Sequence, residues 1–431
     1  MNPPRLGVRL ADAQRRTHGW HARYTEHRVD PPSPTEPASP IERWALDPDV
    51  VHLNHGSFGG CPRAVLDAAA AWRAKLEASP MRFLVLEWQR ELDRARAALA
   101  AFLRAPAERL AFVSGATTAV AIALHSCAPS LAAGDELLTT DHAYRACRNQ
   151  LERLAAARGL RIATVAVPLP FDAGALVART AAAITPRTKL ALLDHVTSPT
   201  ALRLPLDELV ALLAARGVAI VVDGAHAPGQ LELDVGALLA RGVTYYAGNN
   251  HKWLCAPKGS GFLVAAAGAP AAPVVTSHGA TAAYGPPNRL HAELDWPGTH
   301  DPAPHLAVPA AIAAVDREGG GWPAVIARNH ALAIELRARF IDALGGTASL
   351  GGAPPLAPPG ALGAMAAIPI ALPAGTAPLA LERRLLAEGW EVPIVDLPGG
   401  PLVRLSAHLY NHAGQADALA EKLAGLGVRL R

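Results

Sequence analysis

The run Gly217-Val-Ala-Ile-Val-Val-Asp223 decides the fold of this chain. It is apolar and rich in β-branched residues up to its last position, which is the pattern of a strand buried on both faces of a parallel sheet. Its last residue, Asp223, is a carboxylate at the carboxyl end of that strand. In open α/β sheets, ligands bind at this edge. The run therefore predicts an α/β fold and a place for a site within it.

Short apolar runs and Ala-rich segments alternate on both sides of this strand. Besides 218–223, strands are predicted at 110–113, 136–139, 161–167, 189–195, 243–247 and 260–264. Helices are predicted at 63–77, 84–103, 117–128, 145–158, 173–183 and 206–216. This alternation is typical of a mainly parallel sheet covered by helices, here with seven strands.

Composition predicts three parts along the chain. Residues 1–45 are polar and proline-rich and form an irregular N-terminal extension, residues 46–300 form the large domain, and residues 301–431 form a smaller α+β domain. In the last part, helices are predicted at 305–316, 322–344, 377–388 and 413–426, and strands at 365–371, 391–395 and 402–406.

Charge and cysteine usage exclude several classes of protein. The 40 basic and 37 acidic residues give a net charge of +3, which is too even for a protein that binds nucleic acid or anionic membranes. We find neither a signal peptide nor an apolar run long enough to span a membrane, and therefore expect a cytoplasmic protein. The four cysteines, Cys61, Cys127, Cys147 and Cys255, form no C-x-x-C pair. They predict buried free thiols rather than disulfides or a metal site.

Two segments with small or aromatic residues follow predicted strands. Ser114-Gly-Ala-Thr-Thr118 opens a helix, and such a turn is either a phosphate site or a simple helix cap. Asp141-His-Ala-Tyr144 follows the next strand, where His142 is either a ring that stacks on an aromatic cofactor or an ordinary surface histidine.

Two charged residues complete the pattern. A buried Asp223 requires a cationic partner, and a pyridinium nitrogen is a suitable one, whereas a metal would need more ligands than the nearby His226. Lys252 lies 29 residues further along, beyond the next predicted strand, and is one of only five lysines in the chain. Most lysines are solvated surface residues, but a lysine at this sheet edge can form an imine. Together the four segments predict an enzyme that uses pyridoxal 5′-phosphate.

The order and the residue sequences of these segments resemble those of the class V aminotransferase superfamily, in particular its isopenicillin N epimerase-like branch. The matching motifs are Leu53 to Gly59, His195 to Thr200, Val222 to Gly229, His251 to Leu254, Gly298 to Asp301 and Arg404 to Ser406. The resemblance covers about residues 46–430 and implies the fold type I of pyridoxal-phosphate enzymes. Asn249-Asn250 and His300 differ from the residues expected in the family pattern.

The resemblance also implies the roles of individual residues. Lys252 and His142 are the expected catalytic residues, with Lys252 bound to the cofactor and His142 stacked on its ring. The expected cofactor-binding residues are Ala116, Thr117, His142, Asp223, His226, Asn249, His251, Lys252 and Thr299. The expected substrate-binding residues are Asn54, His55, Ser198 and Arg404, of which Arg404 grips the carboxylate. Thr299 is expected to reach the neighbouring subunit's cofactor, which implies a homodimer with shared active sites.

Several reactions are consistent with this pattern. An amino-acid substrate held as an external aldimine forms a Cα carbanion, and we favour C–S β-elimination from a cysteine-derived conjugate of natural-product (antibiotic) metabolism. The alternatives are epimerisation, with His55, Tyr144 or His300 as the second proton donor, and decarboxylation or oxidative deamination. A persulfide-forming desulfurase is disfavoured because no cysteine follows Cys255. A non-catalytic scaffold is the least favoured reading because Lys252 is present.

Overall fold

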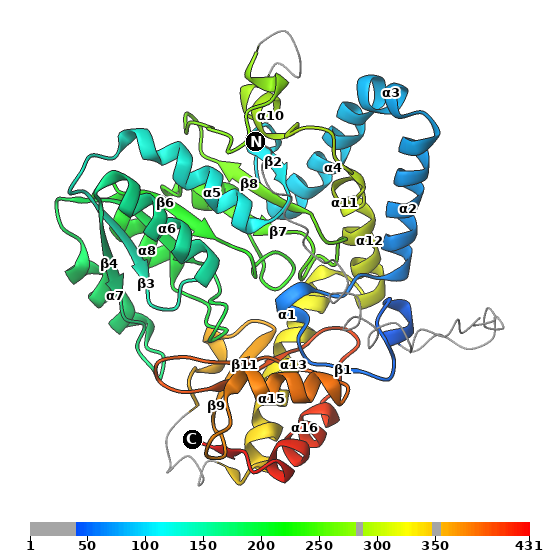
Figure 1. The fold of residues 1–431 in the computed structure, drawn as a ribbon, viewed down its shortest axis with the longest axis vertical. Coiled ribbons are helices and arrows are strands. Elements are labelled where there is room, and N and C mark those ends of the chain that lie inside the picture. The colour runs from blue at the N-terminus through cyan, green and yellow to red at the C-terminus, as the bar shows by residue number, and fades with distance from the viewer. Residues whose placement is uncertain (1–39, 282–287, 347–354) are drawn as a thin grey trace, which may run out of the picture. The chain divides into compact units, whose positions relative to one another are not determined.

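A seven-stranded sheet is the largest sheet of the computed structural model, which describes residues 40–281, 288–346 and 355–431 (Figure 1). Its strands, in spatial order, are β2 (Leu110–Val113), β8 (Gly261–Ala265), β7 (Tyr245–Asn249), β6 (Ala219–Asp223), β5 (Thr188–Asp194), β3 (Glu136–Thr140) and β4 (Arg161–Val165). Strand β8 is antiparallel to both of its neighbours, and all other neighbouring pairs are parallel. The predicted α/β fold with a mainly parallel seven-stranded sheet is confirmed.

Helices cover both faces of this sheet, which explains the continuous apolar run in β6. On one face, Val221 packs in a buried cluster with residues of α5 and α6, whereas Ile220 and Val222 pack on the other face with residues of α7 and α8. These helices and the next one are α5 (Ala116–Cys127), α6 (Arg145–Arg158), α7 (Ala173–Ala183), α8 (Leu206–Ala214) and α9 (Val235–Ala240).

A helical layer flanks the β2 side of the sheet. Its helices are α2 (Arg63–Ala78), α3 (Pro80–Arg82), the π-helical turn η2 (Phe83–Glu87), α4 (Trp88–Leu103), α10 (Arg289–Leu294), α11 (Ala303–Leu306) and α12 (Val308–Gly319). Two further helices, α1 (His55–Phe58) and α13 (Trp322–Ala343), contact the C-terminal part of the chain. The shorter 3-10 turns are η1 (Pro40–Arg43), η3 (Ala107–Arg109), η4 (Ala128–Ser130), η5 (His278–Ala280) and η6 (Pro359–Ala361). Two helix predictions were partly wrong: 84–103 begins as a π-helical turn, and 305–316 is divided between α11 and α12.

The C-terminal part contains a four-stranded antiparallel sheet. Its strands, in spatial order, are β11 (Ile394–Val395), β12 (Leu402–Ser406), β9 (Met365–Ala371) and β13 (Arg429–Leu430). Side chains from α13, α15 (Pro378–Ala387) and α16 (Gly414–Gly425) form a separate buried cluster with this sheet. The sequence 391–395 is not one strand: Pro393 has no N–H to donate and separates β11 from β10 (Trp390–Glu391), which pairs with β1 (Val51–His52).

Part of the N-terminal extension lies in the described structure. Residues 1–39 of the predicted extension 1–45 lie outside the described residues. Trp44 is buried in the main core and forms a β-bridge with Pro62. The boundary between the two predicted domains, at residues 300 and 301, stays a prediction.

Among the described helices, none is both long and apolar enough to cross a membrane.

Candidate active site

A cavity of about 310 Å³ lies at the carboxyl ends of β5, β6 and β7, where the sequence predicted a site. Its lining residues are Ser57, Phe58, Ser114, Gly115, Ala116, Thr117, Thr118, Tyr144, Asp194, Val196, Ser198, Asp223, Ala225, His226, Asn249, His251 and Lys252. Segments far apart in sequence therefore meet at this edge: the α1 helix, the turn before α5 and the ends of three neighbouring parallel strands.

Lys252 is the only lysine among the residues that line this cavity. Its side chain is almost fully buried, and Nζ lies 3.1 Å from Nε2 of His226. Burial, together with the positive charge of Arg404, lowers the pKa of Lys252 to about 7. Because a substantial fraction of the amine is then neutral at neutral pH, Lys252 can act as a nucleophile or accept a proton.

Asp223 is held at the end of β6 by hydrogen bonds to both carboxylate oxygens. The backbone N–H of Ala225 donates to Oδ1 at 3.0 Å, and the Cys147 thiol donates to Oδ2 at 3.1 Å. His226 follows on the next turn, and its buried Nδ1 has no hydrogen-bond partner within the described residues. An unpartnered buried nitrogen of this kind is expected to meet a polar ligand atom.

The N-terminus of α5 forms the opposite wall of the cavity. The N-cap residue of this helix, Gly115, has no side chain that could cap it, and the Ala116 N–H donates to the side-chain Oδ1 of Asn249 at 2.8 Å. The turn can lie this close to β8 because a Cβ at Gly261 would lie only 2.5 Å from Cα of Gly115. An uncapped helix N-terminus lined with hydroxyl groups is suited to binding a phosphate.

His251 lies on the same wall, next to Lys252. Its Nδ1 lies 3.2 Å from the Ser260 carbonyl oxygen, and burial lowers the pKa of His251 to about 4. The imidazole is therefore neutral at neutral pH and can donate or accept one hydrogen bond in the cavity.

Arg404, on β12, approaches this region from the C-terminal sheet. Its guanidinium donates to Oγ of Ser57 at 2.7 Å, to Oδ1 of Asn54 at 3.3 Å and to the backbone oxygen of Ser198. Burial lowers the pKa of Arg404 only to about 10, so the group stays cationic at neutral pH. Its Nε is buried without a partner in the described structure, which leaves a donor for a ligand.

Five predicted site residues do not line the cavity. Two of them, Asn54 and Arg404, are hydrogen-bonded to the lining residue Ser57. His142 lies outside the lining, and its Nδ1 is bonded to Oγ1 of Thr200 at 2.9 Å. His55 is buried behind the lysine loop, where Nε2 lies 3.1 Å from the Lys252 carbonyl oxygen and Nδ1 lies 2.9 Å from the Tyr410 hydroxyl. Thr299 is exposed on the surface. The roles predicted for His142, His55 and Thr299 therefore have no direct support from the cavity geometry.

The structure also adds cavity residues that the sequence did not single out. Asp194 was predicted to lie within a strand, but its side chain lines the cavity at the end of β5. The signal that identified Asp223, a carboxylate at the end of a buried strand, applies equally to Asp194. Tyr144, which was considered only as a proton donor, also lines the cavity, as does the aromatic residue Phe58.

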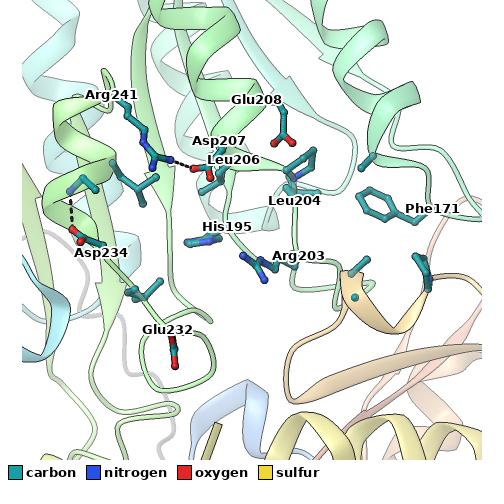
Figure 2. Close-up of a pocket in the computed structure, with 18 residues that line it drawn as sticks. Phe171, His195, Arg203, Leu204, Leu206, Asp207, Glu208, Glu232, Asp234 and Arg241 are labelled. Carbon is teal, nitrogen blue, oxygen red and sulfur yellow. Dashed lines mark hydrogen bonds and ion pairs between the residues drawn. The ribbon is translucent and has the colours of Figure 1, made fainter. Parts of the chain in front are cut away.

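A larger cavity, of about 540 Å³, lies elsewhere on the molecule and contains none of the predicted site residues (Figure 2). His195 lies on its wall and follows Asp194 directly, but it belongs to the other face of the sheet, where its Nδ1 is 2.9 Å from the Tyr246 hydroxyl. The ion pair between Arg241 and Asp207 crosses part of this cavity. No lysine is among the residues that line this larger cavity, and we therefore assign the site to the smaller cavity.

The donors of the smaller cavity fit a phosphorylated pyridine cofactor. The uncapped start of α5 suits the phosphate, Asp223 suits the ring nitrogen, and Lys252 can bond to the aldehyde carbon. Fold and site thus define an α/β enzyme with a reactive lysine at the carboxyl edge of its sheet.

Comparison with known proteins gives the family. The chain belongs to the class V aminotransferase family, because the model described as "Aminotransferase class-V" matches residues 60–343. It is 40% identical over 411 residues to the isopenicillin N epimerase of Amycolatopsis lactamdurans, which covers 90% of this chain and 98% of that protein. The predicted resemblance is confirmed.

Two further comparisons extend this result. A putative L-cysteine desulfhydrase of Oryza sativa subsp. japonica is 35% identical over 312 residues, or 69% of this chain and 63% of that protein. Among solved structures, the cystine C–S lyase C-DES in complex with its product cysteine persulfide superposes with a TM-score of 0.73 at 22% identity, covering 88% of this chain and 98% of that one. The latter likeness shows the shared fold.

Proposed function

We propose that this chain is a pyridoxal-phosphate enzyme that cleaves the C–S bond of a cysteine-derived amino acid by β-elimination. The observation that carries the proposal is Lys252, which is buried beside His226 with its pKa lowered to about 7, in a cavity that also contains Asp223 and an uncapped helix N-terminus. When bound, the cofactor withdraws electrons from Cα of the amino acid.

The residues of this chain would then divide the work among binding, orientation and proton transfer. Asp223 would accept the hydrogen bond of the ring nitrogen, and Ala116, Thr117, Asn249 and His251 would hold the phosphate. Arg404, oriented by Asn54 and Ser198, binds the substrate carboxylate. Lys252 would take the proton from Cα, because its amine, with a pKa lowered to about 7, is partly neutral at neutral pH.

Elimination makes the smaller demand on the cavity. Epimerisation needs a second proton donor on the face opposite Lys252, and of the three candidates His55, Tyr144 and His300 only Tyr144 lines the cavity. Elimination can use Lys252 alone. The likeness to a protein named as a putative L-cysteine desulfhydrase supports the same reaction. With cysteine as substrate the balanced reaction is cysteine plus water giving pyruvate, ammonia and hydrogen sulfide.

Epimerisation of the isopenicillin N type is the second candidate. It is supported by the 40% identity to an isopenicillin N epimerase and by Tyr144, whose phenol lines the cavity and is 42% exposed. In this alternative Lys252 removes the Cα proton and Tyr144 returns one to the other face. Tyr144→Phe would then abolish the reaction, whereas elimination would continue.

One experiment separates these candidates. Purified protein is incubated in heavy water with L-cysteine, a cysteine S-conjugate or an isopenicillin N-type substrate, and pyruvate release and Cα deuteration are followed together. Pyruvate release that is lost in Lys252→Ala and retained in Tyr144→Phe supports elimination. Deuterium exchange with inversion and without pyruvate contradicts it and supports the epimerase.

We also propose that the enzyme is a homodimer. Five large apolar side chains are exposed along the segment from α1 to η2, namely Phe58, Leu66, Met81, Val85 and Leu86. Three of them, Met81, Val85 and Leu86, follow closely in sequence, and exposed apolar side chains that gather in one place mark protein–protein contacts. Because Phe58 also lines the cavity, a second subunit packed against this segment would close the site and allow Thr299 to reach the neighbouring phosphate. Light scattering of the purified protein tests the dimer.

A further inference from the structure

Two carboxyl side chains lie directly opposite each other at the edge of the sheet that forms the site. Strand β5 ends at Asp194 and strand β6 ends at Asp223, and the two residues are paired in the parallel register. Leu192 and Val221, two positions earlier, pack in the same buried cluster, so both carboxyl groups lie on the same face of the sheet. Neighbouring strands are about 4.8 Å apart, which brings the two groups close together.

Both side chains are almost completely removed from water. Asp194 and Asp223 are each 4% exposed, and both line the cavity. No ion pair of the described residues includes either of them. The backbone N–H groups of Tyr144 and of Asp194 itself act to lower the pKa of Asp194, but they do not neutralise a charge.

The other groups that face the pair do not supply two compensating charges. From α6, the Cys147 thiol bonds to Asp223, and burial and the two carboxylates keep the thiol protonated by raising its pKa. From the β6 and β7 loops, burial lowers the pKa of His226 and His251, so both are neutral at neutral pH. Of these groups Lys252 is the one that is partly cationic, and the charge of Asp223 acts on it.

Two buried carboxylates side by side cannot both ionise without a large cost. Burial, followed by the charge of Asp223, raises the pKa of Asp194 well above its usual value. The carboxyl group of Asp194 is therefore the one expected to keep its proton.

We propose that Asp194 is protonated at neutral pH and donates a hydrogen bond to Asp223, and that it is thereby a positioning residue for the carboxylate that faces the cofactor ring. The pair then carries one negative charge in place of two. The effect of this shared proton on the cofactor rests on the proposed function, whereas the shared proton itself is a property of this chain alone.

The proton can be observed directly by infrared spectroscopy. The full chain, with and without cofactor, is measured at pH 8, where Asp295, whose pKa is raised to about 6, is ionised. We expect the carbonyl band of a protonated carboxylic acid in the wild type and its loss in Asp194→Asn. Asp172→Asn, which changes an exposed helix cap, is the matched control and keeps the band. A band that persists in Asp194→Asn, or no band in the wild type, overturns the proposal.

A second variant keeps the test informative if Asp194→Asn folds poorly. In Asp223→Asn the neighbouring charge is removed, and the band of Asp194 is expected to titrate at a pH lower by about one unit or more. An unchanged midpoint contradicts the pairing. A protein that never binds pyridoxal phosphate but shows both infrared results contradicts the proposed function and leaves the shared proton intact.

Discussion

Replacing Arg404 with alanine tests the substrate-binding part of the site. The guanidinium is 3% exposed, keeps its charge at neutral pH, and has an unpartnered Nε in the described structure. Loss of a buried charged partner costs about 2–5 kcal/mol. Taking about 3 kcal/mol, and a factor of ten for each 1.4 kcal/mol, we expect kcat/KM for the amino-acid substrate to fall by about 100-fold.

The assay is steady-state kinetics with the cofactor's visible absorbance followed in parallel. Arg404→Lys keeps the charge but cannot make the bidentate hydrogen bonds of a guanidinium, and its kcat/KM is expected to fall less than that of Arg404→Ala. Ser57→Ala removes one hydrogen bond of 2.7 Å to the guanidinium and is expected to cost about 1 kcal/mol, or about fivefold. An unchanged kcat/KM in Arg404→Ala, with the cofactor still bound, would refute the assignment of the carboxylate clamp.

Three other predictions concern the lysine, the subunit interface and the core. The rate at which added pyridoxal phosphate bonds to the stripped protein should rise with pH through about 7 and then level off, because only the neutral Lys252 amine reacts; a rise centred on its usual value of 10.5 would contradict burial. Met81→Glu with Leu86→Glu should shift the protein from dimer to monomer in light scattering, and an unchanged mass would place the interface elsewhere. Arg96→Met should lower the free energy of unfolding by about 3 kcal/mol, measured by denaturant titration, because it leaves Asp295 buried without its partner at 2.6 Å. This decrease in the free energy of unfolding should be smaller at pH 5 than at pH 8, since Asp295 can take up a proton at pH 5.

The main sheet could be predicted because its strands are buried on both faces. In β6, and in β5 from Leu190 to Leu193, alternate residues are buried in two different clusters, which requires a continuous run of apolar side chains and gives a strong local signal. The two-residue strands β1 and β13 were missed, because pairing with distant strands, and not their own sequence, creates them. The division of 391–395 was readable from Pro393 but was not predicted.

The site was predicted only in part. Residues at strand ends, such as Asp223 and Asn249, could be placed because parallel strands bring their carboxyl ends to one edge. The orientation of side chains in turns could not be predicted. In Asp141-His-Ala-Tyr144, the chain turns after β3 so that His142 bonds to Thr200 and Tyr144 lines the cavity. His55 similarly depends on a contact with the backbone of Lys252, 197 residues away.

The central claim is that Lys252 binds the cofactor covalently. The most direct measurement is borohydride reduction of the purified protein with bound pyridoxal phosphate, followed by digestion and mass spectrometry. We predict a phosphopyridoxyl group on the peptide that contains Lys252, and on none of the other four lysines of the chain. A stable label on another lysine, or retention of the reducible absorbance band in Lys252→Ala, would contradict the account.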